Sequence, residues 1–140
     1  MREVFEALVQ GVAQGLQISA PELLVSGAME VDGVDFRMLL HESPVEGVVI
    51  LLCRFGPLSD EDPLAMCRLL QTNLQLVDGE MSSYFAMDEA SMDVVFCVRT
   101  MLLDTSVEDL LECIRVCTVE AKAWRGAAHS PLARSGVLMP

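Results

Sequence analysis

A two-residue Asp32-Gly33 turn between two alternating segments is the feature that most limits the fold of this chain. Asp-Gly pairs tolerate the positive φ angles of a two-residue hairpin turn, so the flanking segments are expected to pair antiparallel. After the turn, apolar side chains occupy every second position: Val34, Phe36, Met38 and Leu40. The chain turns again at Pro44 and Gly47, and the following run Val48–Phe55 (VVILLCRF) is apolar on both faces, which indicates a central strand. These segments predict three consecutive antiparallel strands.

Three segments have the spacing of amphipathic helices. The first covers residues 3–17 and is followed by a connection that contains Pro21. The last begins at a capping box formed by Thr105 and Glu108 and extends to Trp124. The second lies between them and differs from both in its apolar pattern.

The second helix carries two apolar stripes. Asp62 is expected to cap it, Pro63 suits its first position, and Gly79 ends it. The first stripe consists of Met66, Cys67, Leu70, Leu74 and Val77. The second, offset stripe consists of Leu69 and Leu76. One stripe suffices for packing against a core, so the other raises the question of what it contacts.

Two further strands are expected after the second helix, over residues 83–88 and 92–101. Because the strands arrive in hairpins, we predict an α+β fold of order α-β-β-β-α-β-β-α, with a twisted, mostly antiparallel five-stranded sheet and three helices. No linker divides the chain. We expect a single domain over residues 1–126 and a flexible C-terminal tail over residues 127–140, where helical periodicity is lost.

Apolar side chains exceed what one small core usually needs. They make up 52% of the residues without glycine, whereas soluble domains reach about 45–50% with glycine included. The longest apolar run, Val48–Cys53, is far shorter than the ~20 residues of a membrane span. We therefore expect a cytoplasmic protein that is not inserted in a membrane and uses its apolar surplus on a protein partner. The net charge of −12 disfavours nucleic acid and could attract a basic partner.

The sequence contains no recognisable catalytic or cofactor motif. A Gly-rich phosphate loop, GxSxG and HExxH are all absent, so we expect no enzyme, no cofactor, no metal site and no catalytic residue. Nine methionines suit either core filling or a pliable binding surface. The five cysteines show no CxxC spacing and are expected to be reduced core residues: Cys53, Cys67, Cys97, Cys113 and Cys117. Arg54 beside Cys53 and Arg68 beside Cys67 keep a small thiol-based enzyme or redox protein as an alternative.

The other candidates for chemistry are two histidines and a group of acids. His41 ends a strand and His129 lies in the tail, and neither neighbours a cysteine in the sequence. Asp88, Glu89 and Asp93 flank a turn and could pair as carboxylates. Their ordinary role is to keep such a turn in solvent.

From Leu69 to Trp124 the chain resembles the class I chaperones of type III secretion, the CesT/Tir-chaperone family. The resemblance rests on LLQTNL at the end of the second helix, the turn at Gly79, the strand segments YFAMDE and MDVVFCVRT, and AKAW near the end of the last helix. The N-terminal half is similar more loosely, through its amphipathic helix and three strands with VDG at a turn. The resemblance covers residues 1–126.

The resemblance implies a homodimer in the bacterial cytoplasm, associated with virulence and without enzymatic activity. It would bind an extended N-terminal segment of a secreted effector and keep that segment soluble and export-competent. It also implies dimerisation through the second helix, with Leu69, Asn73 and Leu76 facing the other subunit. An alternative is a regulatory adaptor of the same fold that sequesters a transcriptional or secretion regulator. The expected partner-binding residues, each of which could instead belong to the core, are Phe5, Val9, Val12, Met38 and Leu40.

Overall fold

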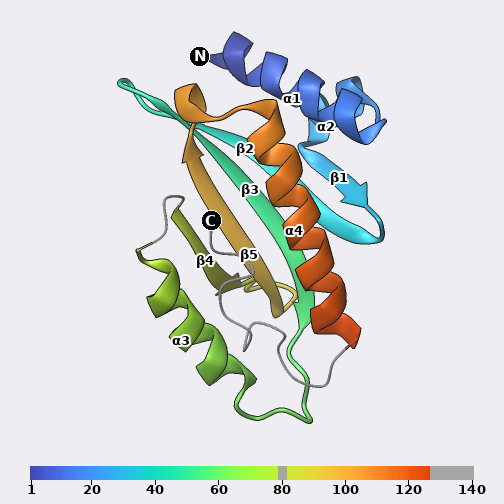
Figure 1. Ribbon diagram of the computed structural model, residues 1–140, viewed down its shortest axis with the longest axis vertical. Helices are drawn as coiled ribbons and strands as arrows, with labels where there is room; N and C mark the ends of the chain where they lie inside the picture. Colours follow the sequence, from blue (N-terminus) through green and yellow to red (C-terminus); the bar gives the residue numbers. More distant parts are fainter. Residues whose placement is uncertain (79–81, 127–140) are drawn as a thin grey trace.

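The computed structural model describes residues 1–78 and 82–126, which form one sheet flanked by helices (Figure 1). The elements in chain order are α1 (Arg2–Leu16), α2 (Ala20–Ser26), β1 (Ala28–Val31), β2 (Val34–Glu42), β3 (Gly47–Pro57), α3 (Ala65–Leu76), β4 (Ser82–Met87), β5 (Asp93–Met101), the short 3-10 helix η1 (Leu102–Asp104) and α4 (Val107–Gly126).

The sheet has the strand order β1-β2-β3-β5-β4, and every neighbouring pair is antiparallel. The strand predicted to be central, Val48–Phe55, lies within β3 in the middle of this order. A β-bulge between Arg54 and Gly56 shifts the register with β5, and Gly56 has a φ of 113° there. The predicted α+β class and antiparallel five-stranded sheet are confirmed. The expected tail, residues 127–140, and Gly79 lie outside the described residues.

The expected number of three helices is wrong, because the connection after α1 contains a further helix, α2. The Ser19 side chain caps it by accepting a hydrogen bond from Glu22 N at 3.4 Å, and Pro21 lies in its first turn. Gly27 ends it with a φ of 71°. Proline is tolerated in the first turn of a helix, where its missing N–H has no intrahelical partner. Pro21 therefore marks the first turn of α2 and not a loop.

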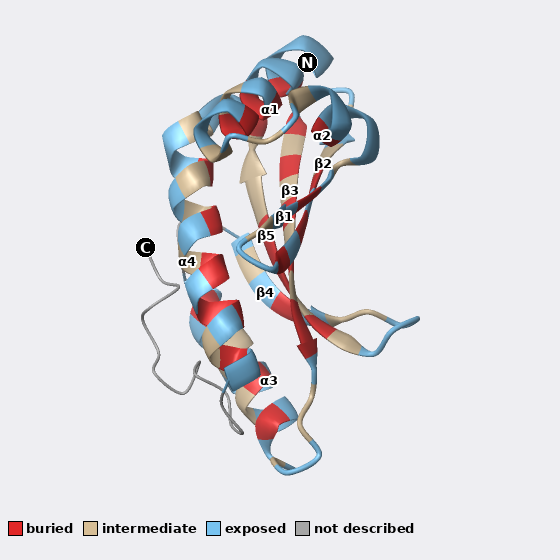
Figure 2. Cartoon of the chain, turned by 90° about the vertical axis from the view of Figure 1, so that its right-hand side faces the viewer, coloured by how far each residue is buried: buried red, intermediate tan, exposed pale blue. Residues whose placement is uncertain are grey.

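One face of the sheet holds the core. Figure 2 shows α1 and α4 on the same side of the sheet, with buried positions at every second residue of the central strands. On β3 the buried side chains include Val49, Leu51, Cys53 and Phe55. Phe55 contacts Phe85 and Trp124 at ring-centroid distances of 5.4 and 6.0 Å. Aromatic pairs at such distances add to the free energy gained by burial.

Two glycines let α1 approach α4 closely. A Cβ atom at Gly11 would lie 2.5 Å from Val107 Cγ2, and one at Gly15 would lie 2.7 Å from Leu111 Cδ1. A side chain larger than hydrogen at either position would require Val107 or Leu111 to shift. Gly15, which weakens a helix in isolation, is thus a packing residue here.

The start of α3 differs from its prediction. The helix begins at Ala65 with Leu64 as N-cap, and no side chain caps it. Asp62 precedes the helix: its carbonyl accepts a hydrogen bond from Ala65 N at 3.1 Å, and its carboxylate pairs with Arg68. The ion pair holds the carboxylate at the side of the helix, so Asp62 does not act as the cap.

The capping box of α4 is shifted by one residue from its prediction. Ser106 Oγ accepts a hydrogen bond from Asp109 N at 3.1 Å, and Asp109 Oδ2 accepts one from Ser106 N at 3.3 Å. Thr105 instead donates from Oγ1 to Met101 O at 2.6 Å, which fixes the turn before the helix. Ser106 and Asp109 therefore take the roles expected of Thr105 and Glu108.

Candidate functional site

The expected partner-binding residues lie mostly in the core. Phe5, Val9, Val12 and Met38 are buried, with exposed fractions of 5%, 2%, 0% and 2%, and Leu40 is half-buried against them. They belong to one buried cluster that also contains residues of the other strands and of α4. A partner reaches them only if α1 moves, so the exposed neighbours of these residues are the accessible surface.

The two stripes of α3 have the opposite arrangement from the one that the resemblance implies. Leu69 and Leu76 are 6% and 3% exposed and belong to the chain's own core. The other stripe points outward, since Leu74 is 75% exposed. We call this row the α3 outer row: Met66, Leu70, Leu74 and Val77. Its four neighbouring apolar side chains, and not Leu69 and Leu76, are available to a second molecule.

Asn73 on α3 closes one edge of the sheet. Its Nδ2 donates to Phe85 O at 3.0 Å, and its Oδ1 accepts from Phe85 N at 2.6 Å. The amide thereby makes the pair of hydrogen bonds that another strand would make with the edge strand β4. At the opposite edge, β1 pairs only with β2, so its outer side is the available edge of the described sheet.

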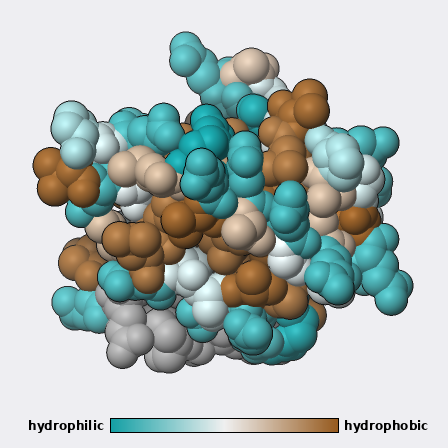
Figure 3. All heavy atoms as spheres, turned by 90° about the horizontal axis from the view of Figure 1, so that it is seen from above, coloured by the Kyte–Doolittle hydropathy of each residue, from teal (hydrophilic) through white to brown (hydrophobic). Residues whose placement is uncertain are grey.

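A second apolar surface lies at the end of the molecule formed by α1, α2 and η1. Figure 3 looks onto this end and shows apolar side chains gathered between polar ones. Val25 and Leu103 are 89% and 82% exposed. We call this surface the α1–α2 end and define it by the exposed apolar residues Met1, Val4, Leu24, Val25 and Leu103.

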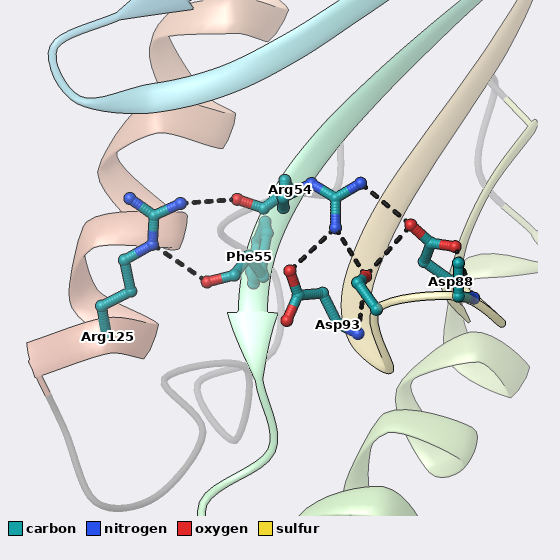
Figure 4. A network of polar contacts seen from close by, with 7 residues as sticks. Arg54, Phe55, Asp88, Asp93 and Arg125 are labelled. Atoms are coloured by element: carbon teal, nitrogen blue, oxygen red, sulfur yellow. Dashed lines mark hydrogen bonds and ion pairs between the residues drawn. The ribbon is translucent and has the colours of Figure 1, made fainter.

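The acids near the β4–β5 turn form ion pairs and do not pair as carboxylates. Arg54 donates to Asp88 at 3.0 Å and to Asp93 at 2.8 Å (Figure 4). The hydrogen bond from Arg54 lowers the pKa of Asp88. Through these ion pairs both acids hold the turn against β3, which is a structural role.

Arg125 fixes the C-terminal end of α4 to the sheet. Its guanidinium donates to Phe55 O at 3.0 Å, to Arg54 O at 2.9 Å and to Gly33 O at 2.9 Å. The first two contacts are drawn in Figure 4. Lys122 adds an ion pair with Asp32 at 2.6 Å. The end of α4 is thus attached to β3 and to the Asp32-Gly33 turn.

Most of the cysteines are shielded from solvent. Cys53, Cys97 and Cys117 are buried and Cys113 is half-buried, while Cys67 is exposed. Hydrogen bonding to Cys117 and burial raise the pKa of Cys113, and burial raises that of Cys97, which disfavours thiolates.

The arginines next to cysteines in the sequence contact acids instead, since Arg54 pairs with Asp88 and Asp93, and Arg68 pairs with Asp62. Within residues 1–78 and 82–126, no group of three or more metal-ligating side chains is present. His41 is exposed at the end of β2, and His129 lies outside the described residues.

No protein-family model and none of the curated proteins matches the chain. Solved structures do match, and two of them are complexes of secretion chaperones. The type III secretion chaperone SycH from Yersinia pestis, in complex with a stable fragment of YscM2, matches 86% of this chain and 98% of its own, with 18% identity and a TM-score of 0.63. The HopA1–SchA chaperone–effector complex matches with 20% identity, a TM-score of 0.64 and coverage of 89% and 94%.

The fold is that of type III secretion chaperones. Both matches extend over most of each chain, so they include the sheet and the helices around it. In the described part of the chain, no helix is long and apolar enough to cross a membrane.

Proposed function

We propose that this chain is a type III secretion chaperone that binds an extended N-terminal segment of a secreted effector in the bacterial cytoplasm. The observation that carries the proposal is the fold shared with two secretion chaperones. The mechanism is stoichiometric binding that blocks aggregation and premature folding, without nucleotide, cofactor or turnover. The raised pKa values of Cys97 and Cys113 count against a thiol-based enzyme.

Two features of the described residues suit an extended client. The outer side of β1 leaves backbone N–H and C=O groups that a client strand can pair with. The α1–α2 end offers exposed apolar side chains next to the buried cluster of Phe5, Val9 and Val12. We therefore place the client contacts on the exposed neighbours of this cluster, such as Val4, and not on the buried residues themselves.

We further propose that the chaperone is a homodimer that associates through the α3 outer row. This row places four apolar side chains on one helix face, with exposed fractions between 48% and 75%. Exposed apolar surface of this kind is typical of protein interfaces. The proposal keeps dimerisation on α3 but moves it from Leu69 and Leu76 to the exposed side of the helix.

Hydrogen exchange of the chaperone with and without its client tests the function. The client is first identified by crosslinking in the native host, and its N-terminal segment is then purified with the chaperone. We expect protection along the client segment, in β1 and at the start of α1, because a paired strand shields backbone amides from exchange. Amides of α4 serve as the internal control, since their protection should not change.

Three outcomes would count against the proposal. A client that remains a compact folded domain in the complex would contradict chaperone action. A bound protein that is never exported would favour the regulatory adaptor. Catalytic turnover of a substrate by the purified chain would favour an enzyme.

A further inference from the structure

The sheet has a second face, which is turned away from α1 and α4 (Figure 2). Successive side chains of a strand point to opposite faces, so the residues between the buried positions of β2, β3 and β5 share this second face. The register of the strands brings them together in adjacent rows. We call this the open face; its half-buried apolar residues are Leu39, Val48, Ile50, Leu52 and Val95.

These apolar residues are not members of the core. The buried cluster and the side chains packed against it include the alternate residues of the same strands, such as Leu40, Val49 and Leu51, and none of the five residues of the open face. They remain accessible to a partner laid across the strands.

Two arginines flank the apolar centre. Arg37 on β2 lies directly opposite Leu52, and Arg99 on β5 lies directly opposite Ile50. Neither arginine has an ion pair with any residue in the described parts of the chain. Arg54 on the same face differs, because Asp88 and Asp93 neutralise it.

The positive charge of these arginines is local. The chain has 21 acidic and nine basic residues, yet the centre of the open face presents two guanidinium groups without acidic partners among the described residues. Besides the acids that pair with Arg54, this face carries Glu30 and Asp35, which lie opposite each other on β1 and β2, with Asp35 two residues from Arg37. A partner of the open face therefore meets apolar side chains between positive charges, although the molecule as a whole is acidic.

The spacing of the two arginines fits an extended peptide. They lie two strand spacings apart across the sheet and two residues apart along it, which places their Cα atoms about 12 Å apart. Four residues of an extended chain span about 13 Å, and even spacing keeps their side chains on one side. Two acidic residues four positions apart, with an apolar residue midway, would match both arginines and the apolar centre.

We propose that the open face binds an extended client segment in which acidic and apolar residues alternate, with carboxylates on Arg37 and Arg99. The proposal rests on the proposed chaperone function and specifies one part of the client. Guanidinium groups bind carboxylates through paired, charge-assisted hydrogen bonds, which give this surface its selectivity. It replaces, for this face, the expectation of a basic partner that the net charge suggests.

Labelled twelve-residue peptides provide the probe. One peptide has acidic residues four apart with leucine midway between them, and a second has lysine in place of each acid. Fluorescence anisotropy measures their binding to the wild-type protein and to the single variants Arg37→Glu and Arg99→Glu. Arg115→Glu is the matched control, because Arg115 lies on the exposed side of α4 and its loss changes the net charge equally.

We expect the acidic peptide to bind the wild-type protein at least tenfold more tightly than the lysine peptide. Arg37→Glu and Arg99→Glu should each weaken the binding of the acidic peptide about tenfold and strengthen the binding of the lysine peptide. Arg115→Glu should leave the affinity for both peptides unchanged. Equal binding of both peptides, or equal effects of all three variants, would overturn the proposal. Circular dichroism checks the folding of each variant, and light scattering measures its mass. A change of mass in the Arg37 and Arg99 variants alone would mean that the open face binds a second copy of this chain.

The native client separates this proposal from the chaperone function. If the client segment binds the wild-type, Arg37→Glu and Arg99→Glu proteins equally, the open face is not its binding site and the chaperone function stands. If the client segment does not bind the wild-type protein, the chaperone function itself fails.

Discussion

The helices α3 and α4 both pack against the sheet, yet they use their apolar residues differently. Seven residues of α4 are buried, and Val119 is its only large apolar residue that is strongly exposed. Three of the 12 residues of α3 are buried, and three large apolar residues of the helix itself, together with Val77 after it, are exposed. The ends differ as well: α4 has the Ser106–Asp109 box and the Arg125 contacts, whereas no side chain caps the start of α3.

This difference separates a helix that completes the core from one that also presents a surface. The stability of α4 comes from burial and from fixed ends. The folded chain retains the α3 outer row in solvent, where exposed apolar side chains add little to the stability of a monomer. The contrast predicts that substitutions in α4 change folding, whereas substitutions in the outer row change association.

Replacing Trp124 by alanine should have the largest effect on folding. Trp124 is 7% exposed and contacts Phe55, so truncation leaves a cavity between α4 and β3. We expect a loss of about 3–5 kcal/mol in the free energy of unfolding. Urea denaturation followed by circular dichroism measures it. Leu70→Ala on α3 is the control and should change stability by no more than about 0.5 kcal/mol.

Replacing Leu74 by aspartate should separate the subunits without unfolding them. Leu74 is 75% exposed in the single chain, so the charge is solvated in a monomer and unpaired in an interface. We expect a cost of about 3 kcal/mol in association, or roughly 100-fold in the dissociation constant. Light scattering on a size-exclusion column measures the mass, against 15.3 kDa for one chain.

The control for Leu74→Asp is Leu103→Asp, because Leu103 on η1 is 82% exposed and lies outside the outer row. It should leave the mass unchanged. A wild-type protein that is already monomeric at micromolar concentration would contradict the dimer. Loss of the dimer in both variants would mean that the interface is not confined to α3.

Replacing Asn73 by alanine should have an intermediate effect on folding. The substitution leaves the N–H and C=O groups of Phe85 without their partners from α3. We expect a loss of about 1–3 kcal/mol, because unsatisfied groups in a partly buried site cost their desolvation energy. Gln71→Ala, an exposed position on the same helix, is the matched control. Equal stability of both variants would show that the amide is not what closes the β4 edge.

The fold was predictable where a pattern repeats over many residues. Alternation after Asp32-Gly33 predicted the strands, and helical spacing predicted α1, α3 and α4. The seven-residue helix α2 is too short for periodicity, although Ser19 and Glu22 carry the spacing of a capping box. At the start of α4, adjacent Thr105 and Ser106 both suit a cap, and only the path of the backbone decides between them.

The surfaces were less predictable than the fold, because the spacing of apolar residues does not determine which side of a helix packs against the sheet. Both stripes of α3 satisfy helical spacing, and the position of β4 determines that Leu69 and Leu76 turn inward. Asn73 gave no sequence signal for its contact with Phe85, which lies 12 residues away. The pairing of Arg54 with Asp88 and Asp93 likewise depends on strand register, which sequence spacing alone does not give.

The smallest expected effect concerns the start of α4, where the two possible capping boxes can be separated. Ser106→Ala removes the acceptor for Asp109 N and should cost about 1 kcal/mol in the free energy of unfolding. Glu108→Ala removes a charge from the same first turn but no capping bond, so it should cost no more than about 0.5 kcal/mol. Urea denaturation of both variants gives the difference. A larger loss for Glu108→Ala would restore the Thr105–Glu108 box and would mean that α4 begins one residue earlier in solution.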